Sequence, residues 1–189
     1  LTNDWVEAYK QRRAVRVAVK AEDTPTAPEL EAIEIPEPHS IQKEALLALQ
    51  NSRKDGADAG LVVLATGLGK TWLSAFDSRE FKRVLFVAHR EEILGQAMQT
   101  YRKIRPQDYL GHYTGAEKHP DADILFASIQ TLSRQTHLER FQADRFDYIV
   151  IDEFHHAAAA TYRRLINYFT PTYLLGLTAT PERSDGADL

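Results

Sequence analysis

Five short apolar segments recur along this chain, and they constrain its fold more than any other feature. The segments are rich in Val, Ile, Leu and Phe and are separated by stretches with helical periodicity. Continuous apolar runs of this kind are typical of strands that are buried on both faces of a parallel sheet. We therefore predict an α/β protein with a mostly parallel central sheet, whose strands cover residues 61–65, 84–88, 124–127, 148–151 and 174–177.

Two stretches between these segments carry apolar residues at helical spacing. The first covers residues 93–104 and the second residues 162–169. An apolar stripe at this spacing predicts helices that pack against the sheet. We interpret the aromatic residues of both stretches as core residues rather than as platforms that stack on nucleic-acid bases.

A glycine-rich loop directly follows the first apolar segment. Residues 66–71 read Thr-Gly-Leu-Gly-Lys-Thr, between a predicted strand and a predicted helix. Glycines let backbone N–H groups approach phosphates, the lysine would reach the outer phosphates, and the last threonine would offer its hydroxyl to Mg²⁺. The full pattern has a further glycine where Leu64 stands, so a simple glycine turn remains the alternative for this loop taken alone. The loop predicts ATP or GTP binding through Thr66, Gly67, Leu68, Gly69, Lys70 and Thr71.

An acidic pair, Asp152 and Glu153, follows the fourth apolar segment. Mg²⁺ prefers hard oxygen ligands, so a carboxylate at the end of a strand suits a magnesium nucleotide site. We predict that Asp152 lies on the metal side and that Glu153 polarises the attacking water. Two alternatives remain: the acids cap a helix that begins near Phe154, or His155 and His156 bind zinc. Adjacent histidines in a chain without cysteine make a poor zinc site.

With these motifs, the chain resembles the first motor domain of superfamily 2 helicases and translocases of the DExH type, over roughly residues 36–186. Gln42 resembles the family's adenine-reading glutamine, although His39 stands where arginine is commoner. Asp152, Glu153 and His155 match the DExH box. Thr178 and Thr180 match the motif that couples the nucleotide state to movement.

The resemblance implies a RecA-like P-loop NTPase, a three-layer α/β sandwich that uses ATP and Mg²⁺. It implies catalytic roles for Lys70, Asp152 and Glu153, with Thr71 and Asp152 holding the metal. The bacterial restriction-type branch, similar to the res subunit of type III restriction enzymes, matches best through residues 87–94 and 178–185. That branch favours DNA over RNA as the nucleic-acid partner.

The same resemblance implies a strand-binding surface, because several motif residues follow the carboxyl ends of predicted strands. The alternative is that Gly111 and Gly115 only form turns or loops, and that Ser128 and Thr131 cap a helix. Both interpretations remain open for each residue taken singly. The residues implied to contact nucleic acid are His89, Arg90, Thr114, Gly115, Gln130 and Thr131.

The chain divides by composition into three parts. We expect a basic helix and tail at 1–20, and an extended connector with four prolines and six acidic residues at 21–38. Residues 39–189 would form the first helicase ATP-binding domain. Residue 1 is not Met and the sequence stops soon after Thr180, so we expect a fragment without the second motor domain. Such a fragment would hydrolyse ATP close to background.

Charge and composition narrow the function further. The net charge of -4 argues against a strongly basic nucleic-acid clamp, but not against a motor that holds one strand. The absence of cysteine excludes disulfides, and neither a signal peptide nor a membrane span is apparent, so we expect a cytoplasmic protein. The alternatives to an ATPase motor are a kinase-type phosphoryl-transfer enzyme and a nucleotide-gated binding module that does not hydrolyse ATP.

Overall fold

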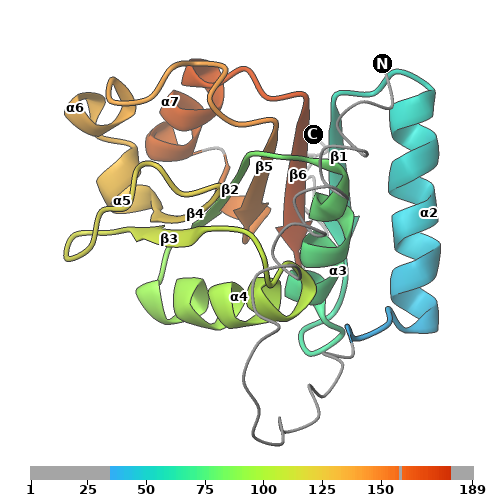
Figure 1. Cartoon of the computed structure of the whole chain (residues 1–189). Coiled ribbons are helices and arrows are strands. Elements are labelled where there is room, and N and C mark those ends of the chain that lie inside the picture. The colour runs from blue at the N-terminus through green and yellow to red at the C-terminus, as the bar shows by residue number, and fades with distance from the viewer. Residues whose placement is uncertain (1–34, 158, 180–189) are drawn as a thin grey trace, which may run out of the picture. The chain divides into compact units, whose positions relative to one another are not determined.

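Six parallel strands form one sheet (Figure 1). The computed structural model describes residues 35–157 and 159–179. All strand pairings of the sheet are parallel, in the order β1-β6-β5-β2-β4-β3. The predicted α/β class is therefore confirmed. The strands are β1 (Ala59–Val63), β2 (Val84–Ala88), β3 (Leu110–Tyr113), β4 (Ile124–Ser128), β5 (Tyr148–Asp152) and β6 (Tyr173–Thr178).

Three predictions fall wholly or partly outside the described residues. These are the basic helix and tail at 1–20, most of the connector at 21–38, and Thr180 of the coupling motif. Residues 35–38 of the connector are described and form neither helix nor strand. The domain boundaries remain predictions.

Helices cover both faces of the sheet (Figure 1). One face packs against α2 (Ser40–Lys54), α3 (Lys70–Asp77) and α4 (Glu91–Ile104), and the other against α5 (Ile129–Leu132), α6 (Gln135–Leu138) and α7 (Ala160–Tyr168). Two short 3-10 helices, η1 (Ser78–Glu80) and η2 (Phe154–His156), complete the elements. The helices expected at 93–104 and 162–169 correspond to α4 and α7, and the aromatic residues of both are mostly core residues, as predicted.

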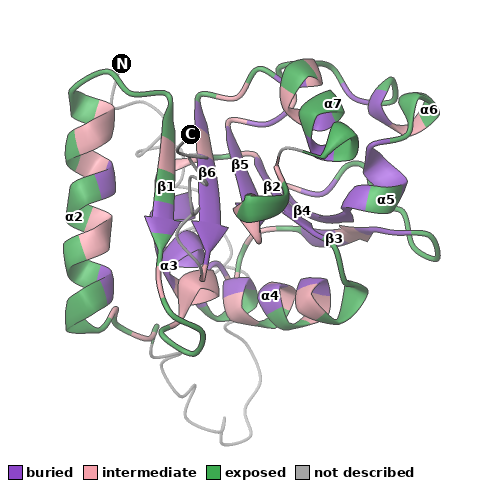
Figure 2. Ribbon diagram, turned by 180° about the vertical axis from the view of Figure 1, so that it is seen from behind, coloured by how far each residue is buried: buried purple, intermediate pink, exposed green. Residues whose placement is uncertain are grey.

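Alternating side chains of the central strands supply the two layers of the core. In β2, Val84 and Phe86 face the layer of α3 and α4, whereas Leu85 and Val87 face the layer of α5 and α7. Strands β2, β4 and β5 are buried along their whole length, which appears as continuous purple in Figure 2. The prediction that the apolar runs are strands buried on both faces is confirmed for these three.

The prediction of two buried faces is wrong for β1. Its side chains Leu61 and Val63 are 49% and 42% exposed, whereas Val62 is buried. The physical reason is position: β1 pairs only with β6 and forms an edge of the sheet, and the buried side chain is the one that faces α2 and α3. The apolar run also extends past the strand, so that Leu64 and Ala65 begin the following loop.

A sixth strand, β3, was not predicted. It lies at the other edge of the sheet, and in its sequence Leu-Gly-His-Tyr the buried Leu110 and Tyr113 are separated by Gly111 and His112, so no apolar run marks it. The alternative interpretation of Gly111 as loop punctuation is wrong, since it lies inside this strand. A Cβ at Gly111 would approach the Cβ atoms of His119 and Ala122 to 2.6 and 2.9 Å. Glycine is therefore required by close packing of the following loop.

A buried ion pair ties α2 to α3. The Asp77 carboxylate is buried and accepts two hydrogen bonds from the Arg53 guanidinium, at 3.0 and 2.8 Å. The Tyr148 hydroxyl donates a third hydrogen bond to Asp77, at 2.7 Å. The Arg53 guanidinium also lies over the rings of Phe81 and Tyr173, at 5.5 and 4.9 Å from their centroids. These contacts fix the far end of the helix that carries Gln42.

We expect Tyr148→Phe to lower the free energy of unfolding by about 1.5 to 3 kcal/mol. The substitution removes a hydrogen bond to a buried charged group while keeping the aromatic ring in place. Chemical denaturation of the variant would measure the loss. The control is Tyr109→Phe, since Tyr109 is 50% exposed and should change stability little. Equal stability of the two variants would show that the Arg53–Asp77 pair needs no third partner.

Candidate nucleotide site and nucleic-acid interface

The glycine-rich loop connects β1 to the amino end of α3, as the sequence predicted. Gly67 and Gly69 have φ of 87° and 78°, and Gly69 is the residue before the helix. Glycine adopts such left-handed backbone without strain. The Leu64 backbone N–H donates to the Thr178 carbonyl at 3.0 Å, which fixes the loop to the end of β6. The free N–H groups at the start of α3 form the kind of cradle that binds phosphate.

Gln42 is buried beside this loop. Its side-chain oxygen accepts a hydrogen bond from the His39 backbone N–H at 2.9 Å, within the first turn of α2. Its amide nitrogen donates to the carbonyl of Gly69 at 3.3 Å. A Cβ at position 69 would collide with that nitrogen, which is a second reason for glycine there. The structure thus brings the predicted base-reading residue against the predicted phosphate loop.

Lys70 and Asp152 come from different segments that both lie at the carboxyl end of β6, since Leu64 bonds to Thr178 and Asp152 pairs with Leu177. The Lys70 ammonium donates to the Leu64 carbonyl at 3.1 Å. Asp152 ends β5 and is 8% exposed, and it forms no ion pair with any residue of the described part. Burial raises the pKa of the Asp152 carboxyl, and the charge of Glu153 raises it further, whereas Lys70 acts in the opposite sense. The Glu153 backbone N–H and His155 also favour the charged form. A buried carboxylate without an ion-pair partner in the described residues suits a cation.

Glu153 has a left-handed backbone, with φ of 54° and ψ of 51°. It is the only non-glycine residue with positive φ among residues 35–157 and 159–179. Its carboxylate lies 3.2 Å from His155 Nδ1, and the same nitrogen lies 3.3 Å from the Thr178 hydroxyl. The acidic pair is therefore connected through His155 to the end of β6.

The two alternative interpretations of this segment find little support. Glu153 does precede η2, but its side chain makes no capping hydrogen bond. The rings of His155 and His156 lie 4.1 Å apart, yet no group of three His, Cys, Asp or Glu side chains suited to a metal is found in the described residues. Two histidines are fewer ligands than a zinc site needs.

His89 and Gln130 lie together at the carboxyl ends of β2 and β4. The Gln130 amide donates to the His89 carbonyl at 2.8 Å and lies 2.9 Å from His89 Nδ1. Arg90 follows, exposed, at the residue before α4. These three side chains are available at the surface for a ligand. Their contact with nucleic acid stays a prediction.

Thr114, Gly115 and Thr131 have structural roles in the same region. The Thr114 hydroxyl accepts hydrogen bonds from the N–H groups of residues 116 and 117, both at 3.2 Å, in a tight turn that includes Gly115. The Ser128 hydroxyl caps α5 by accepting a hydrogen bond from the Thr131 backbone N–H at 3.4 Å, and it donates to the Thr131 hydroxyl at 2.9 Å. The capping interpretation is thus confirmed for Ser128, whereas Thr131 lies inside α5 and donates the capped N–H. A contact of these residues with nucleic acid is not excluded by it and stays a prediction.

Gly176 supports the acidic segment, although the sequence analysis did not single it out. A Cβ at this position would approach the Phe154 ring to 2.6 Å. Gly176 therefore makes room for η2, which carries His155. The available signal was a lone glycine inside an apolar run, which often marks close approach of another segment.

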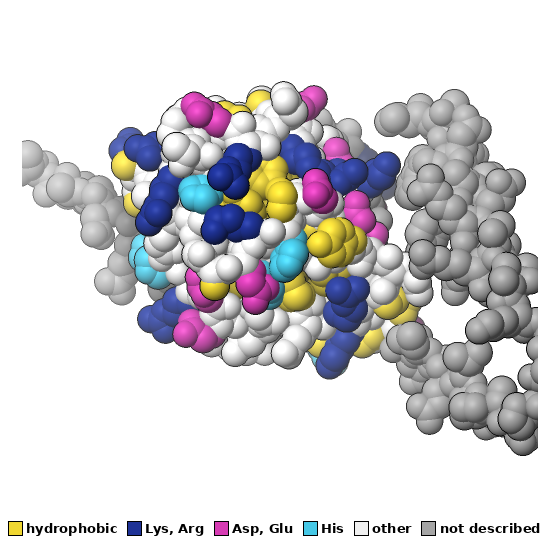
Figure 3. Space-filling model, turned by 60° about the vertical axis from the view of Figure 1, so that its left-hand side comes forward, with side chains coloured by type: hydrophobic (Ala, Val, Ile, Leu, Met, Phe, Trp, Pro, Cys, Tyr) yellow, Lys and Arg dark blue, Asp and Glu magenta, His cyan; other side chains and the backbone are white. Residues whose placement is uncertain are grey.

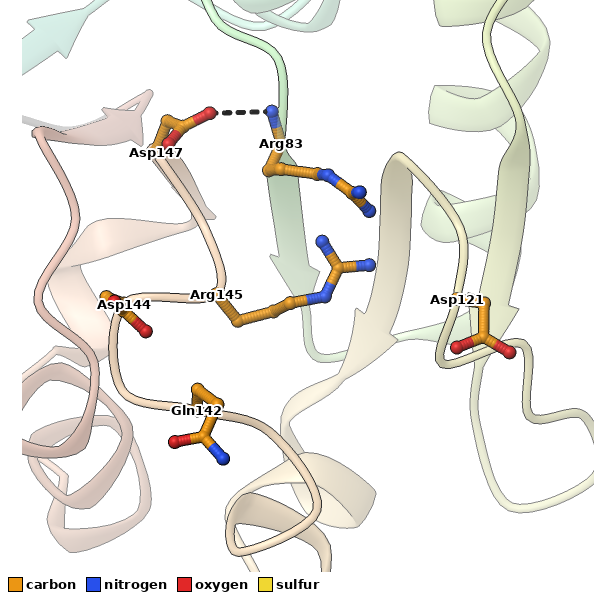
Figure 4. Close-up of a pocket in the computed structure, with 6 residues that line it drawn as sticks. All are labelled: Arg83, Asp121, Gln142, Asp144, Arg145 and Asp147. Atoms are coloured by element: carbon orange, nitrogen blue, oxygen red, sulfur yellow. Dashed lines mark hydrogen bonds between the residues drawn. The ribbon is translucent and has the colours of Figure 1, made fainter.

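A pocket of about 530 Å³ lies at the amino ends of the strands, opposite the motif residues (Figure 4). Its residues Arg83 and Asp147 stand just before β2 and β5, and the Arg83 backbone N–H donates to Asp147 at 2.9 Å. The Arg145 guanidinium donates to the carbonyl of Ala122 at 3.0 Å. None of the predicted site residues lines this pocket. The motif residues instead lie at the carboxyl ends of the strands.

An all-parallel sheet with a phosphate loop and an acidic pair at its carboxyl edge defines a RecA-like P-loop domain. The family model described as "Type III restriction enzyme, res subunit" matches residues 35–183. The chain belongs to this family, as its resemblance to the restriction-type branch of helicase motors implied.

Two curated relatives represent the similarity in sequence. The "Putative ATP-dependent helicase IRC3" of Saccharomyces cerevisiae is 34% identical over 166 residues, which cover 76% of this chain and 23% of that protein. The type I restriction enzyme EcoAI endonuclease subunit of Escherichia coli is 29% identical over 161 residues, which cover 78% of this chain and 20% of that protein. The chain thus spans less than a quarter of the length of either relative.

Solved structures support the fold. The Sulfolobus solfataricus SWI2/SNF2 ATPase core in complex with dsDNA aligns with a TM-score of 0.62 and 21% identity, covering 80% of this chain and 34% of that chain. The Pyrococcus furiosus Hef helicase domain aligns with a TM-score of 0.62 and 24% identity, covering 78% and 34%. No helix of the described residues is long and apolar enough to cross a membrane.

Proposed function

We propose that this chain is the ATP-binding half of a nucleic-acid-dependent ATPase, a helicase or translocase that uses ATP and Mg²⁺. The observation that carries the proposal is that the glycine-rich loop and Asp152 both lie at the carboxyl end of β6: the Leu64 N–H donates to the Thr178 carbonyl at 3.0 Å, and Asp152 pairs with Leu177. The arrangement suits the phosphates of a nucleotide and their divalent cation.

The residues present fit both cofactors. Gly67 and Gly69 leave the loop backbone open, and Asp152 offers a buried carboxylate without an ion-pair partner in the described residues. Thr71 and Asp152 would hold Mg²⁺, which keeps several waters and needs few protein ligands. The metal neutralises charge on the phosphates. Gln42 would read adenine, with residues 66–71 around the phosphates.

Glu153 would orient the attacking water and accept its proton. Its carboxylate reaches His155, and His155 reaches the Thr178 hydroxyl, as described above. These contacts connect the proposed catalytic carboxylate to the end of β6. We propose that His155, Thr178 and Thr180 couple hydrolysis to movement in this way.

The proposed nucleic-acid partner is DNA rather than RNA. One support is the family, whose model is described by a subunit of a restriction enzyme. Another is that some relatives have DNA in their names, such as the "DNA 3'-5' translocase XPB2" of Sulfurisphaera tokodaii, which is 30% identical over 128 residues. His89, Arg90, Thr114, Gly115, Gln130 and Thr131 would form the strand-binding surface. We further propose a second motor domain in the same protein as a partner, and a cytoplasmic location.

The deciding experiment is ATP turnover by the full-length protein with DNA, with RNA and with neither. We expect DNA to stimulate hydrolysis and GTP to be a poor substitute, since Gln42 lies beside the loop. Stimulation by RNA alone would overturn the choice of DNA. Bound but unhydrolysed ATP under all conditions would favour the nucleotide-gated binding module. Phosphate transfer to a small acceptor would favour the kinase-type alternative.

We expect Arg90→Ala to weaken binding of DNA by the full-length protein with little dependence on sequence. Arg90 is exposed at the carboxyl end of β2 and would neutralise one phosphate. The slope of log K against log salt concentration should therefore flatten by about 0.7 to 0.9. Arg79→Ala, at an exposed position beyond α3, is the matched control. An unchanged slope for Arg90→Ala would mean that Arg90 is an ordinary solvent-exposed residue that does not contact DNA.

A further inference from the structure

A group of basic side chains surrounds α6 and takes no part in the nucleotide site. We call Lys118, Arg134, His137 and Arg140 the α6 basic surface. Lys118, Arg134 and Arg140 are exposed, and within the described part of the chain none of them forms an ion pair with a carboxylate. Figure 3 shows Lys and Arg side chains gathered around a histidine on this side of the molecule.

The surface is held by a rigid support. His137 Nδ1 lies 2.9 Å from the hydroxyl of Tyr113, and the two rings pack edge to face at 5.6 Å. Tyr113 ends β3 and is fully buried, as is Leu138 of α6. The nearest acid to the helix in sequence, Glu139, accepts a hydrogen bond from Gln135 at 2.6 Å. Glu139 is the residue after α6, and in the described residues it forms no ion pair with the basic side chains.

The positive charges of the α6 basic surface are concentrated around His137. Partial burial lowers the pKa of the His137 imidazole, and the positive charges of Arg140, Lys118 and Arg134 lower it further. The geometry agrees: the backbone N–H of His137 donates to the Arg134 carbonyl at 2.9 Å, and that of Arg140 donates to the His137 carbonyl at 3.3 Å. Lys118 pairs with Tyr113, the partner of His137. This concentration of positive charge stands out in a chain whose net charge is -4. Such a local potential attracts a polyanion.

The surface continues the edge where nucleic acid is proposed to bind. The Lys118 ammonium donates to the Gly115 carbonyl at 3.4 Å, and Thr114 directly follows Tyr113. The turn of residues 114–117 contains the proposed strand-binding residues Thr114 and Gly115. Lys118 of the α6 basic surface directly follows this turn. A chain of phosphates that leaves Gly115 would meet Lys118 next.

We propose that the α6 basic surface binds the phosphate backbone of DNA beyond the segment held at the carboxyl edge of the sheet. This inference rests on the proposed function, and it names the path of the same nucleic acid. Exposed Lys and Arg side chains contact phosphates without reading bases, so the contact is independent of sequence. It extends the binding site and strengthens binding of long DNA more than of short DNA.

The test compares two triple variants of the full-length protein that lose the same charge. One carries Lys118→Gln, Arg134→Gln and Arg140→Gln. The control carries Lys54→Gln, Arg79→Gln and Lys82→Gln, three exposed positions at the carboxyl end of α2 and beyond α3. Binding of a long duplex and of a strand too short to pass Gly115 is measured over a range of salt concentrations, with ATP turnover as a check of the fold.

For the long duplex we expect the slope of log K against log salt concentration to be shallower by about 2 to 3 in the α6 variant. Each lost phosphate contact accounts for about 0.9 of this change. The control variant and the short strand should show no change. Exchange of Lys118 for Arg, and of Arg134 and Arg140 for Lys, should preserve the slope because it preserves the charges.

Four results would overturn the inference. The first is an unchanged slope for the α6 variant while the unaltered protein binds DNA, which leaves the proposed function standing. The second is an equal loss in both triple variants, which indicates a general effect of net charge. The third is failure of the unaltered protein to bind any DNA, which removes the proposed function as well. The fourth is displacement of the long duplex from the α6 basic surface by polyglutamate as effectively as by unlabelled DNA, which would assign the surface to an acidic protein instead.

Discussion

Glu153→Gln is expected to leave ATP bound and to slow its hydrolysis by about 10² to 10⁴-fold, the usual contribution of a positioned general base. The substitution keeps the size of the side chain and the possibility of a contact with His155, which lies 3.2 Å from the carboxylate. It removes the negative charge that would orient the water and take its proton. Binding should therefore survive where catalysis does not.

Two measurements separate these effects. Titration with a fluorescent ATP analogue reports binding, and a single-turnover experiment at saturating ATP reports the chemical step. Glu44→Gln, at an exposed position on α2, is the control for loss of one carboxylate. Normal turnover by Glu153→Gln would mean that another group activates the water, and the role of the acidic pair would then be limited to the metal.

Lys70→Ala is expected to abolish detectable ATP binding or, where some binding remains, to lower turnover by about 10² to 10³-fold. That is the range seen when one donor that stabilises developing charge is removed. Within residues 35–157 and 159–179 the Lys70 ammonium has one hydrogen bond, to the Leu64 carbonyl at 3.1 Å. Its loss should cost only about 1 kcal/mol of stability. The fold should therefore persist.

The control for this second prediction is Lys82→Ala, which removes an exposed lysine just before β2. Denaturation midpoints of the two variants should be close, while ATP affinity should differ sharply. ATP affinity equal to that of the unaltered protein would refute the assignment of the phosphate loop. A large loss of stability in Lys70→Ala would instead mean that the lysine supports the loop itself.

The sequence predicts the central strands well because burial on both faces demands uninterrupted apolar residues. The same logic fails at the edges of the sheet. There, β1 keeps apolar side chains on an exposed face, and β3 is built from residues that include Gly111 and His112. An edge strand pairs with only one neighbour. In β3 the buried Leu110 and Tyr113 are separated by Gly111 and His112, so the strand leaves no continuous apolar run in the sequence.

The candidate site was predictable to the extent that it follows the strand ends. Parallel strands bring their carboxyl ends to one edge, so residues far apart in sequence, such as Lys70 and Asp152, could be expected to meet. The Arg53–Asp77–Tyr148 contacts were not predictable in this way, because they join positions of no motif across 24 and 71 residues. The α6 basic surface likewise depends on a fold that brings Lys118 beside α6.

The left-handed backbone of Glu153 has a consequence for efforts to stabilise this protein. A residue with a Cβ in that region costs roughly 1 to 2 kcal/mol, and glycine would relieve the strain. Glycine, however, has no carboxylate, so the replacement that favours folding most removes the group proposed to act on water. Stability and activity therefore oppose each other at this position, and selection for thermal tolerance alone would drift toward an inactive protein. A library built to raise thermal stability should hold residues 152–155 constant and vary the surface elsewhere.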